Sequence, residues 1–365
     1  MSKHIVILAG GKSQRPYVTE FQKRGWRVTV VDRDPNAVSK SDADVFIENS
    51  TYCLDTLIEK LTQENDTHKI NGVFSNSSAG PVAHNVAELN RVFKTEYPGF
   101  SVTSVARSYS KLSMQEYLRN AKINVAQAFS PNSLHTENFP IVIKPGKNGL
   151  GGLGVKKIES LSALNHAIPS GDIQDWVYES YIEGDEYSVD GLVVDGTLEI
   201  ISLSRKISGD RRDDFIPNRF ELTPINTTPA FSEIYKQSSL AAKALDINNS
   251  QISLDIKIGQ NGVVTVIECG LFWDSKIDRL WAYSGFNGYS YLIDRIFCNK
   301  AQRHDISLSS GAMEILYSDK ETVLNESEIN KKHPQDHIEF EKHTGDKVRP
   351  PLSVADMVAC RFYQY

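Results

Sequence analysis

One stretch, residues 140–158, limits the fold more than any other part of the chain. Val142 and Ile143 predict a buried strand that ends at Lys144, and the ten residues after it contain five glycines. Glycine at this density costs backbone entropy, so a packed fold keeps it where the chain bends sharply or approaches a ligand closely. The β-branched run at 155–158 then predicts a second strand. A glycine loop flanked by lysines suits phosphate binding through backbone amides.

A dinucleotide site is the first alternative for this loop. Gly149, Gly151 and Gly154 satisfy the spacing G-x-G-x-x-G. That fingerprint requires its last glycine to open a helix. Here a strand-like run follows, and the helical pattern starts only near Ser160. We therefore reject the dinucleotide interpretation of the loop, and a surface hairpin without a ligand remains as the alternative.

The composition is that of a folded globular protein. The chain has 365 residues, of which 40% are hydrophobic and 24% charged, which suits two or three packed lobes. The net charge of −6 does not support nucleic acid as a partner. The apolar run at 5–9 is too short for a signal peptide or a membrane span. The four cysteines lack metal-type or disulfide-type spacing. These features predict a cytoplasmic protein with neither a nucleic-acid nor a membrane partner.

The N-terminal residues predict a βαβ unit. A strand at 4–9 is followed by a glycine turn, a helix capped by Ser13 that ends at Gly25, and a strand at 27–31 that closes on Asp32. Its crossover should be right-handed. An acid in the position of Asp32 can bind the ribose of a nicotinamide cofactor. The first turn lacks the full glycine spacing, so this alternative is the weaker one.

Further elements follow from local patterns. The small-residue loop 75–80 after a third strand is either a ligand site or an ordinary turn. The polar stretch 208–224 lacks a clear period and predicts a functional loop. The remaining expectations are helices at 54–64, 81–93, 110–118 and 231–245, and strands at 72–74, 123–129, 140–144, 190–194 and 198–204.

The hairpin at 251–269 carries the strongest chemical signal. Two alternating strands flank Asn261-Gly262, a two-residue turn signal that would pair Gln260 with Val263. The same register places Asp255 opposite Glu268, with Cβ atoms about 5 Å apart. Like charges there destabilise the hairpin unless they are neutralised, and Mg²⁺ that bridges carboxylates to nucleotide phosphates is the usual solution. The alternatives are a basic partner for one acid, or a shifted register.

In this order, the motifs resemble the ATP-grasp superfamily over most of the chain. The resemblance implies an α/β, ATP-grasp fold with an N-terminal Rossmann-like (pre-ATP-grasp) lobe at 1–107. A lid subdomain with the glycine loop would occupy 108–182, and a C-terminal subdomain with the metal site would occupy 183–365. The C-terminal segment 343–365 is similar to the closing segment of amino-acid ligases in this superfamily.

The resemblance also implies the roles of single residues. Glu179 matches the acid beside the adenine and Glu186 the acid that binds the ribose, while Asp255 and Glu268 match the paired Mg²⁺ ligands. The cofactors implied are ATP and Mg²⁺. The residues that match the family's nucleotide site are Lys111, Lys144, Gly149, Gly151, Gly152, Glu179, Tyr181, Ile182 and Glu186.

Two positions depart from the family pattern. The family has Asn and Arg where this chain has Gly270 and Phe272. Water, backbone or another side chain such as Asp274 would have to replace the missing metal ligand. The missing arginine leaves the stabilisation of an acyl phosphate to other cations, and the candidates are Arg279, Lys206 and Arg211, with Arg205 and Arg212 nearby.

The activity implied is an ATP-dependent carboxylate–amine ligase that forms an amide through an acyl phosphate and releases ADP and phosphate. The tail favours an amino acid as one substrate. The partners implied are a small-molecule carboxylate, an amine and, as in similar ligases, a second copy of the chain in a homodimer. The alternatives are an ATP-grasp carboxylase or purine-pathway ligase, and a nucleotide-binding regulatory protein without catalysis.

Overall fold

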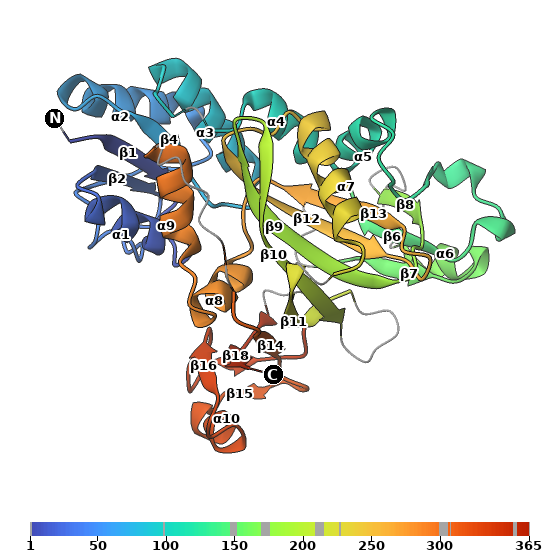
Figure 1. The fold of residues 1–365 in the computed structure, drawn as a ribbon. Coiled ribbons are helices and arrows are strands. Elements are labelled where there is room, and N and C mark those ends of the chain that lie inside the picture. The colour runs from blue at the N-terminus through green and yellow to red at the C-terminus, as the bar shows by residue number, and fades with distance from the viewer. Residues whose placement is uncertain are drawn as a thin grey trace.

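A computed structural model describes residues 2–97, 99–146, 152–168, 176–208, 215–225, 228–298, 306, 308–352 and 356–364. Within these residues the strands form four sheets (Figure 1). A parallel sheet lies at the N-terminal end of the molecule. A large antiparallel sheet occupies the centre, and a small four-stranded sheet lies against its far side (Figure 1). The fourth sheet pairs β15 (Thr322–Val323) with β17 (Lys347–Val348) near α10 (Glu326–Lys332).

The N-terminal lobe confirms the βαβ prediction. Its parallel sheet has the strand order β3-β2-β1-β4, and its strands are almost wholly apolar because helices cover them. Two details of the prediction were wrong: the first helix begins after Gln14 and not after Ser13, and the strand β3 was not foreseen. The elements are β1 (His4–Leu8), α1 (Arg15–Lys23), β2 (Arg27–Asp32), β3 (Val45–Glu48), α2 (Leu54–Thr67), β4 (Gly72–Phe74) and α3 (Gly80–Phe93).

The small sheet has the order β5-β8-β6-β7 and carries the glycine loop. Strands β6 (Ile141–Pro145) and β7 (Lys156–Ile158) pair antiparallel, so the loop joins two strands, as the sequence predicts. Only Ala128–Phe129 (β5) of the expected strand 123–129 pairs within this sheet. The other elements are α4 (Val102–Ser108), α5 (Lys111–Asn120), two short 3₁₀ turns (Pro131–Ser133 and Thr136–Asn138), α6 (Leu161–Ala167) and β8 (Trp176–Ser180).

The large sheet has the order β13-β12-β9-β10-β11-β14-β18-β16. The prediction of a loop over 208–224 was wrong for 217–223, because alternate residues Phe220 and Leu222 are buried and make this segment a strand. The strands are β9 (Asp185–Val194), β10 (Thr197–Ser208), β11 (Pro217–Thr223), β12 (Ser250–Ile258), β13 (Val264–Gly270), β14 (Ala312–Leu316), β16 (His337–Phe340) and β18 (Ala359–Tyr363). The helices are α7 (Phe231–Ala244), α8 (Ser275–Tyr283), α9 (Gly288–Leu292) and the π-helix η5 (Ile293–Phe297).

The hairpin β12–β13 confirms the predicted pairing of Asp255 with Glu268. The predicted turn is wrong, because Ile258 pairs with Val264 and the connection is longer than two residues. The register then shifts between Asp255 and Ile256, since Ile256 pairs with Val266. Ile267 is the extra residue of this β-bulge, and it restores the predicted pairing beyond the shift.

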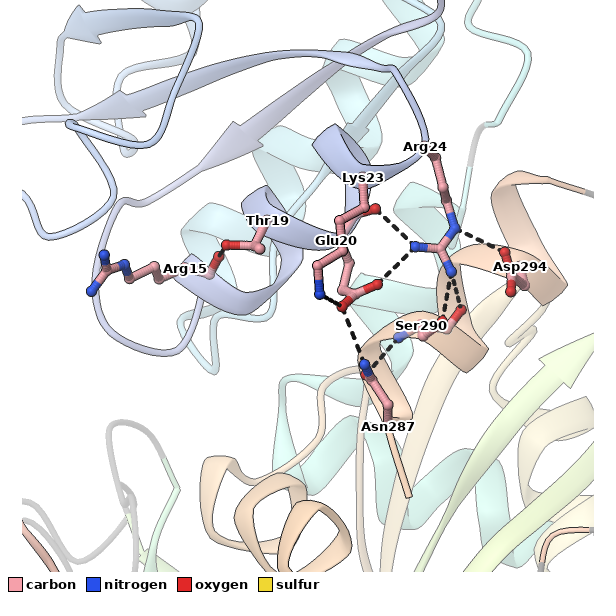
Figure 2. A network of polar contacts seen from close by, with 8 residues as sticks. All are labelled: Arg15, Thr19, Glu20, Lys23, Arg24, Asn287, Ser290 and Asp294. Atoms are coloured by element: carbon pink, nitrogen blue, oxygen red, sulfur yellow. Dashed lines mark hydrogen bonds and ion pairs between the residues drawn. The ribbon is translucent and has the colours of Figure 1, made fainter. Parts of the chain in front are cut away.

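The N-terminal lobe and the large sheet are packed as one body. One apolar cluster contains residues of β1, α3, β12 and α7, whereas the small sheet has a separate cluster of its own around Ile141 and Tyr178. A polar clasp also joins α1 to α9 and η5 (Figure 2). In this clasp the Arg24 guanidinium donates to Glu20, to Ser290 and to Asp294, with the Asp294 bond at 2.8 Å. The boundaries after residues 107 and 182 stay a prediction.

Candidate active site

One face of the large sheet carries a grid of polar side chains. Alternate residues of a strand share a face, so the apolar residues of β9, β12 and β13 face α7 and the polar ones face the opposite side. Three rows of paired positions cross the strands β10, β9, β12 and β13. They are Lys206–Glu186–Lys257, Ser204–Ser188–Asp255–Glu268 and Ser202–Asp190–Ser253–Gly270. The polar grid therefore brings the predicted metal pair beside Glu186 and Lys206.

The predicted nucleotide lysines are all ion-paired with predicted site acids. Lys111, at the start of α5, lies with its Nζ 2.5 Å from Glu268 Oε1. The Lys206 Nζ lies 2.8 Å from both Glu186 Oε1 and Asp255 Oδ2. The N-terminal end of α5 thus meets the polar grid, and the lysines and carboxylates neutralise one another.

Lys144 and Glu179 form a second ion pair between β6 and β8. Their Nζ and Oε2 atoms are 2.6 Å apart, and the side chains are only 8% and 4% exposed. Glu179 Oε1 is buried and has no hydrogen-bond partner among the described residues. A buried acceptor without a donor is costly. This oxygen is therefore a candidate acceptor for a hydrogen bond from a ligand.

The segment after β8 contacts the polar grid through lysines. The Lys257 Nζ donates to the Ile182 carbonyl oxygen at 3.1 Å. The Tyr181 ring lies under two ammonium groups, with Lys157 Nζ 4.3 Å and Lys257 Nζ 5.0 Å from its centroid. Sequence reasoning missed Lys257, although its alternation with Asp255 and Ser253 was a usable signal.

Of the five loop glycines, the structure describes Gly146, Gly152 and Gly154. Gly152 has φ +82°, and a Cβ there would meet the Phe215 carbonyl oxygen at 2.8 Å. Glycine is thus required by conformation and by close packing. The candidates Gly149, Gly151 and Arg211, and also Arg212, lie outside the described residues.

Burial and ion pairing shift the pKa values of the two carboxyls of the metal pair in opposite directions. Burial raises the pKa of Asp255 and outweighs Lys206. Burial also acts on Glu268, but Lys111 outweighs it and lowers the pKa of that carboxyl. Burial disfavours the charge of Lys206, yet Asp255 and Glu186 together raise its pKa. The site therefore holds charged groups whose charge depends on their partners.

Asp190, in the third row, was also missed. It is fully buried and accepts hydrogen bonds from the Ser188 hydroxyl at 2.9 Å and the Ser253 hydroxyl at 2.7 Å. Burial raises its pKa to about 7. Gly270 completes the row on β13, so no side chain stands where the family has its asparagine.

Two other candidates lie in different surroundings. Arg279 pairs with Glu341 and lies 3.7 Å from Glu339 Oε2, so these acidic neighbours lie on and just after β16 and not in the metal pair. Asp274 caps α8 and lies 2.5 Å from Lys276 Nζ. The candidate cations therefore separate into Lys206, inside the polar grid, and Arg279, outside it.

The metal pair fits a divalent cation that takes further ligands from elsewhere. In the described parts of the chain, no three His, Cys, Asp or Glu side chains gather around a common point. Asp255 and Glu268 lie opposite each other, and each is held by an ammonium group that a cation can replace. Two carboxylates completed by water and phosphate oxygens are a usual Mg²⁺ arrangement.

The N-terminal lobe has a cavity of about 390 Å³ at the carboxyl edge of its parallel sheet, lined in part by Asp32, Tyr52 and Ser77. Asp32 already accepts hydrogen bonds from the backbone amides of Gly10 and Asp34, at 2.6 and 2.9 Å. Asn76 of the small-residue loop bonds to Trp273. The loop is thus partly structural and partly a cavity wall.

The structure contains the motifs on which the family resemblance rests: a glycine loop between two strands, lysines of both sheets, and paired carboxylates on a hairpin. Residues 109–268 match the ATP-grasp domain family, so the chain carries an ATP-grasp domain. No curated protein sequence matches the chain.

Solved structures resemble the chain over nearly its whole length. An L-amino acid ligase from Bacillus licheniformis has a TM-score of 0.81 at 16% identity, over 100% of this chain and 93% of that one. An ADP complex of N5-carboxyaminoimidazole ribonucleotide synthetase has a TM-score of 0.78 at 14% identity, over 100% and 93%. A phosphoribosylglycinamide synthetase from Anaerococcus prevotii has a TM-score of 0.74 at 17% identity, over 99% and 94%. At these identities the likeness establishes the fold.

Proposed function

We propose that the protein is an ATP-dependent carboxylate–amine ligase that uses Mg²⁺, releases ADP and phosphate, and takes an amino acid as one substrate. The observation that carries the proposal is the convergence of Lys111, Lys206 and the pair Asp255–Glu268 on one face of the large sheet. Similar folds include an L-amino acid ligase and an ADP complex of a ribonucleotide synthetase.

The nucleotide would lie between the small sheet and the polar grid. Glu179 supports this placement, because its buried Oε1 has no partner in the described parts of the chain and suits the exocyclic amine of adenine. Lys144, beside it, would reach the phosphates, and Glu186 would bind the ribose. The glycine loop would cover the phosphates and exclude water.

The ion pairs of the site would be exchanged when ATP binds. Lys111 and Lys206 would leave their carboxylates for phosphate oxygens, and Mg²⁺ would take their place at Asp255 and Glu268. The metal would supply charge neutralisation between carboxylates and phosphates. Both charges of each ion pair thus keep a partner throughout, which limits the desolvation cost of a buried site.

The chemistry would then follow from positioning. A substrate carboxylate oxygen attacks the γ-phosphorus in line, the bond to the β-phosphate oxygen breaks, and ADP leaves. The amine nitrogen attacks the acyl carbon, the bond to phosphate breaks, and the amine's proton passes to a base. Phosphoryl transfer of this kind depends mainly on alignment and charge stabilisation. Among the described cations, Lys206 would take the role of the family's missing arginine, because it already pairs with both Glu186 and Asp255.

The test is release of ADP and phosphate from Mg²⁺-ATP with amino acids supplied singly and in pairs. We expect release that requires two acceptors, with an amide product detected by mass spectrometry. Release that requires bicarbonate instead would assign the carboxylase alternative. Binding of ATP without release under any of these conditions would assign the nucleotide-binding regulatory protein, which Gly270 and Phe272 favour because they leave two family positions without polar groups.

The substrates, the assembly and the compartment of the protein are part of the same proposal. The substrates would be a small carboxylate and an amine, the assembly a homodimer, and the compartment the cytoplasm, with neither nucleic acid nor a membrane as partner. In the described residues, no helix is long and apolar enough to cross a bilayer. Sedimentation of the purified protein tests the dimer.

A further inference from the structure

A second cavity, of about 550 Å³, lies where the N-terminal lobe meets the segment that leads into the glycine loop. Its walls come from the start of α3, from α4 and the start of α5, and from the residue that follows β6. Figure 1 shows α4 between α3 and α5. A volume of this size is typical of pockets that hold small ligands. The lining of this apolar cavity includes Tyr52, His84, Val105, Tyr109, Leu112 and Gly146.

The walls of the apolar cavity carry large hydrophobic side chains that solvent reaches. Tyr52 is 52% exposed and Leu112 is 54% exposed. Single exposed apolar residues are common on proteins, but two that border one cavity indicate a surface that a ligand covers. The described lining residues include no Asp, Glu, Lys or Arg. An apolar group therefore fits this cavity better than an anion or a cation does.

Contacts within the N-terminal half of the chain hold these walls in place. The Tyr109 hydroxyl donates to the Ser77 carbonyl oxygen at 3.4 Å, and its ring lies so close to Gly80 that a Cβ there would meet it at 3.2 Å. The Asn85 side-chain amide donates at 2.8 Å to the carbonyl oxygen of the residue before Tyr52, and so ties that segment to α3. The apolar cavity is thus formed by the protein's own contacts.

The apolar cavity borders the proposed phosphate site. Leu112 lines it, and the preceding residue, Lys111, pairs with Glu268 of the metal pair. Gly146 lies two residues after Lys144. The carboxylate substrate attacks the γ-phosphorus, so it must lie beside the phosphates that these lysines would bind. A group in the apolar cavity therefore belongs to a molecule whose carboxylate can reach the phosphates.

We propose that the apolar cavity holds the side chain of the carboxylate substrate, so that the ligase activates carboxylates with a large apolar group. An aromatic ring or a branched alkyl chain would fit, and the rings of Tyr52 and Tyr109 favour the aromatic one. The inference rests on the proposed function, because that function identifies the ligand as the molecule that is phosphorylated.

The test measures binding of small probes by calorimetry to the complex with Mg²⁺ and a non-hydrolysable ATP analogue. The first set of probes is alanine, leucine and phenylalanine. The second set contains the matching acids without the amino group, which are propionate, isocaproate and hydrocinnamate. The third set contains the amides of the three amino acids, which lack the carboxylate and can act only as amines.

Two variants change the apolar cavity. Ala106→Phe adds a ring to its wall from an exposed position of α4, and Leu112→Ser removes an apolar side chain from it. Leu240→Ser on α7 is the matched control, because Leu240 is also an exposed leucine of a helix but does not line the cavity.

We expect the affinity of the wild type to rise about tenfold or more from the smallest to the largest probe in at least one of the two acid sets, and not in the amides. Ala106→Phe should abolish this rise and leave the affinities for the smallest acid and for the ATP analogue unchanged. Leu112→Ser should reduce the rise, and Leu240→Ser should keep it. A merely structural role would instead lower the melting temperature of Ala106→Phe and weaken all probes alike.

Three results would overturn the inference: no dependence on size in either acid set, an equal dependence in the amides, or a dependence that persists in both cavity variants. The proposed function fails separately. If the dependence requires the apolar cavity but no ADP is released with any pair of acceptors, the binding site stands and the ligase activity does not.

Discussion

Asp255 lies directly opposite Glu268, although the residues nearer the turn pair in a different register. The register changes because Ile267, between Val266 and Glu268, is an extra residue of β13 without a partner on β12. Both carboxylates lie on the face that Lys111 and Lys206 reach. Deletion of Ile267 should remove the extra residue and leave Glu268 opposite Asp255 on the same face, because Val266 already pairs with Ile256. We expect the deletion variant to keep Mg²⁺-dependent turnover. Loss of turnover in a folded deletion variant would show that the bulge itself sets the site.

Glu268→Gln should weaken Mg²⁺ binding without unfolding the protein. The side chain is 47% exposed, so loss of its ion pair with Lys111 should cost little stability. Turnover at limiting Mg²⁺ should fall about 10–100-fold. Glu159→Gln is the control, because that exposed acid also pairs with a lysine but lies outside the polar grid. Wild-type turnover of Glu268→Gln at limiting Mg²⁺ would refute the metal role.

Lys144→Met should raise the ATP requirement and destabilise the fold together. The substitution leaves Glu179 buried without its counterion. Removal of one partner of a buried ion pair lowers the free energy of unfolding by about 3–5 kcal/mol. The double variant Lys144→Met/Glu179→Gln should recover stability but not ATP affinity. Chemical denaturation and ATP titration separate the two effects, and unchanged ATP affinity in the single variant would remove Lys144 from the phosphate site.

Asp190 predicts a pH dependence of stability. Its pKa in the folded protein is about 7, above the ordinary value of about 4 for an unfolded chain. The folded state thus binds the proton of Asp190 more tightly than the unfolded chain does. The stability that this proton contributes is lost as pH rises from about 4 to about 7. Asp190→Asn should flatten this part of the profile. Chemical denaturation at pH 5 and pH 8 measures the free energy of unfolding of the wild type and of Asp190→Asn. An equal change between the two pH values in both proteins would contradict the assignment.

Arg24→Ala should loosen the contact between α1 and the α9–η5 segment. The guanidinium is mostly buried and holds Glu20, Ser290 and Asp294 at once (Figure 2). Loss of a buried partner of this kind costs about 3 kcal/mol. Arg15→Ala, on the same helix but with an exposed ion pair to Asp42, should cost less than about 1 kcal/mol. Equal melting temperatures for the two variants would mean that the clasp contributes nothing.

Local patterns predicted the parts of the fold that depend on neighbours in sequence. Alternation, turn residues and β-branched runs predicted the first βαβ unit and the two strands around the glycine loop. The predicted pairing of Asp255 with Glu268 is confirmed although the predicted turn is wrong, because the bulge at Ile267 compensates for the longer connection. The strand at 217–223 was missed although its partner β10 directly precedes it, because its other partner, β14, lies far away along the chain. The site residues were chosen by motif, but the lysine–carboxylate pairs and the place of Arg279 depend on tertiary contacts that spacing does not encode.

The shared apolar cluster has a consequence for modularity. Residues of β1 and α3 pack in the same core as those of β12 and α7, whereas the small sheet encloses its own. A graft that exchanged residues 1–107 for those of another chain with this fold would have to match the apolar residues of the large sheet and α7. A graft of the small sheet would have to match only the residues at its border, because its apolar cluster is its own. Recombination among such chains should therefore vary the small sheet more easily than the N-terminal lobe.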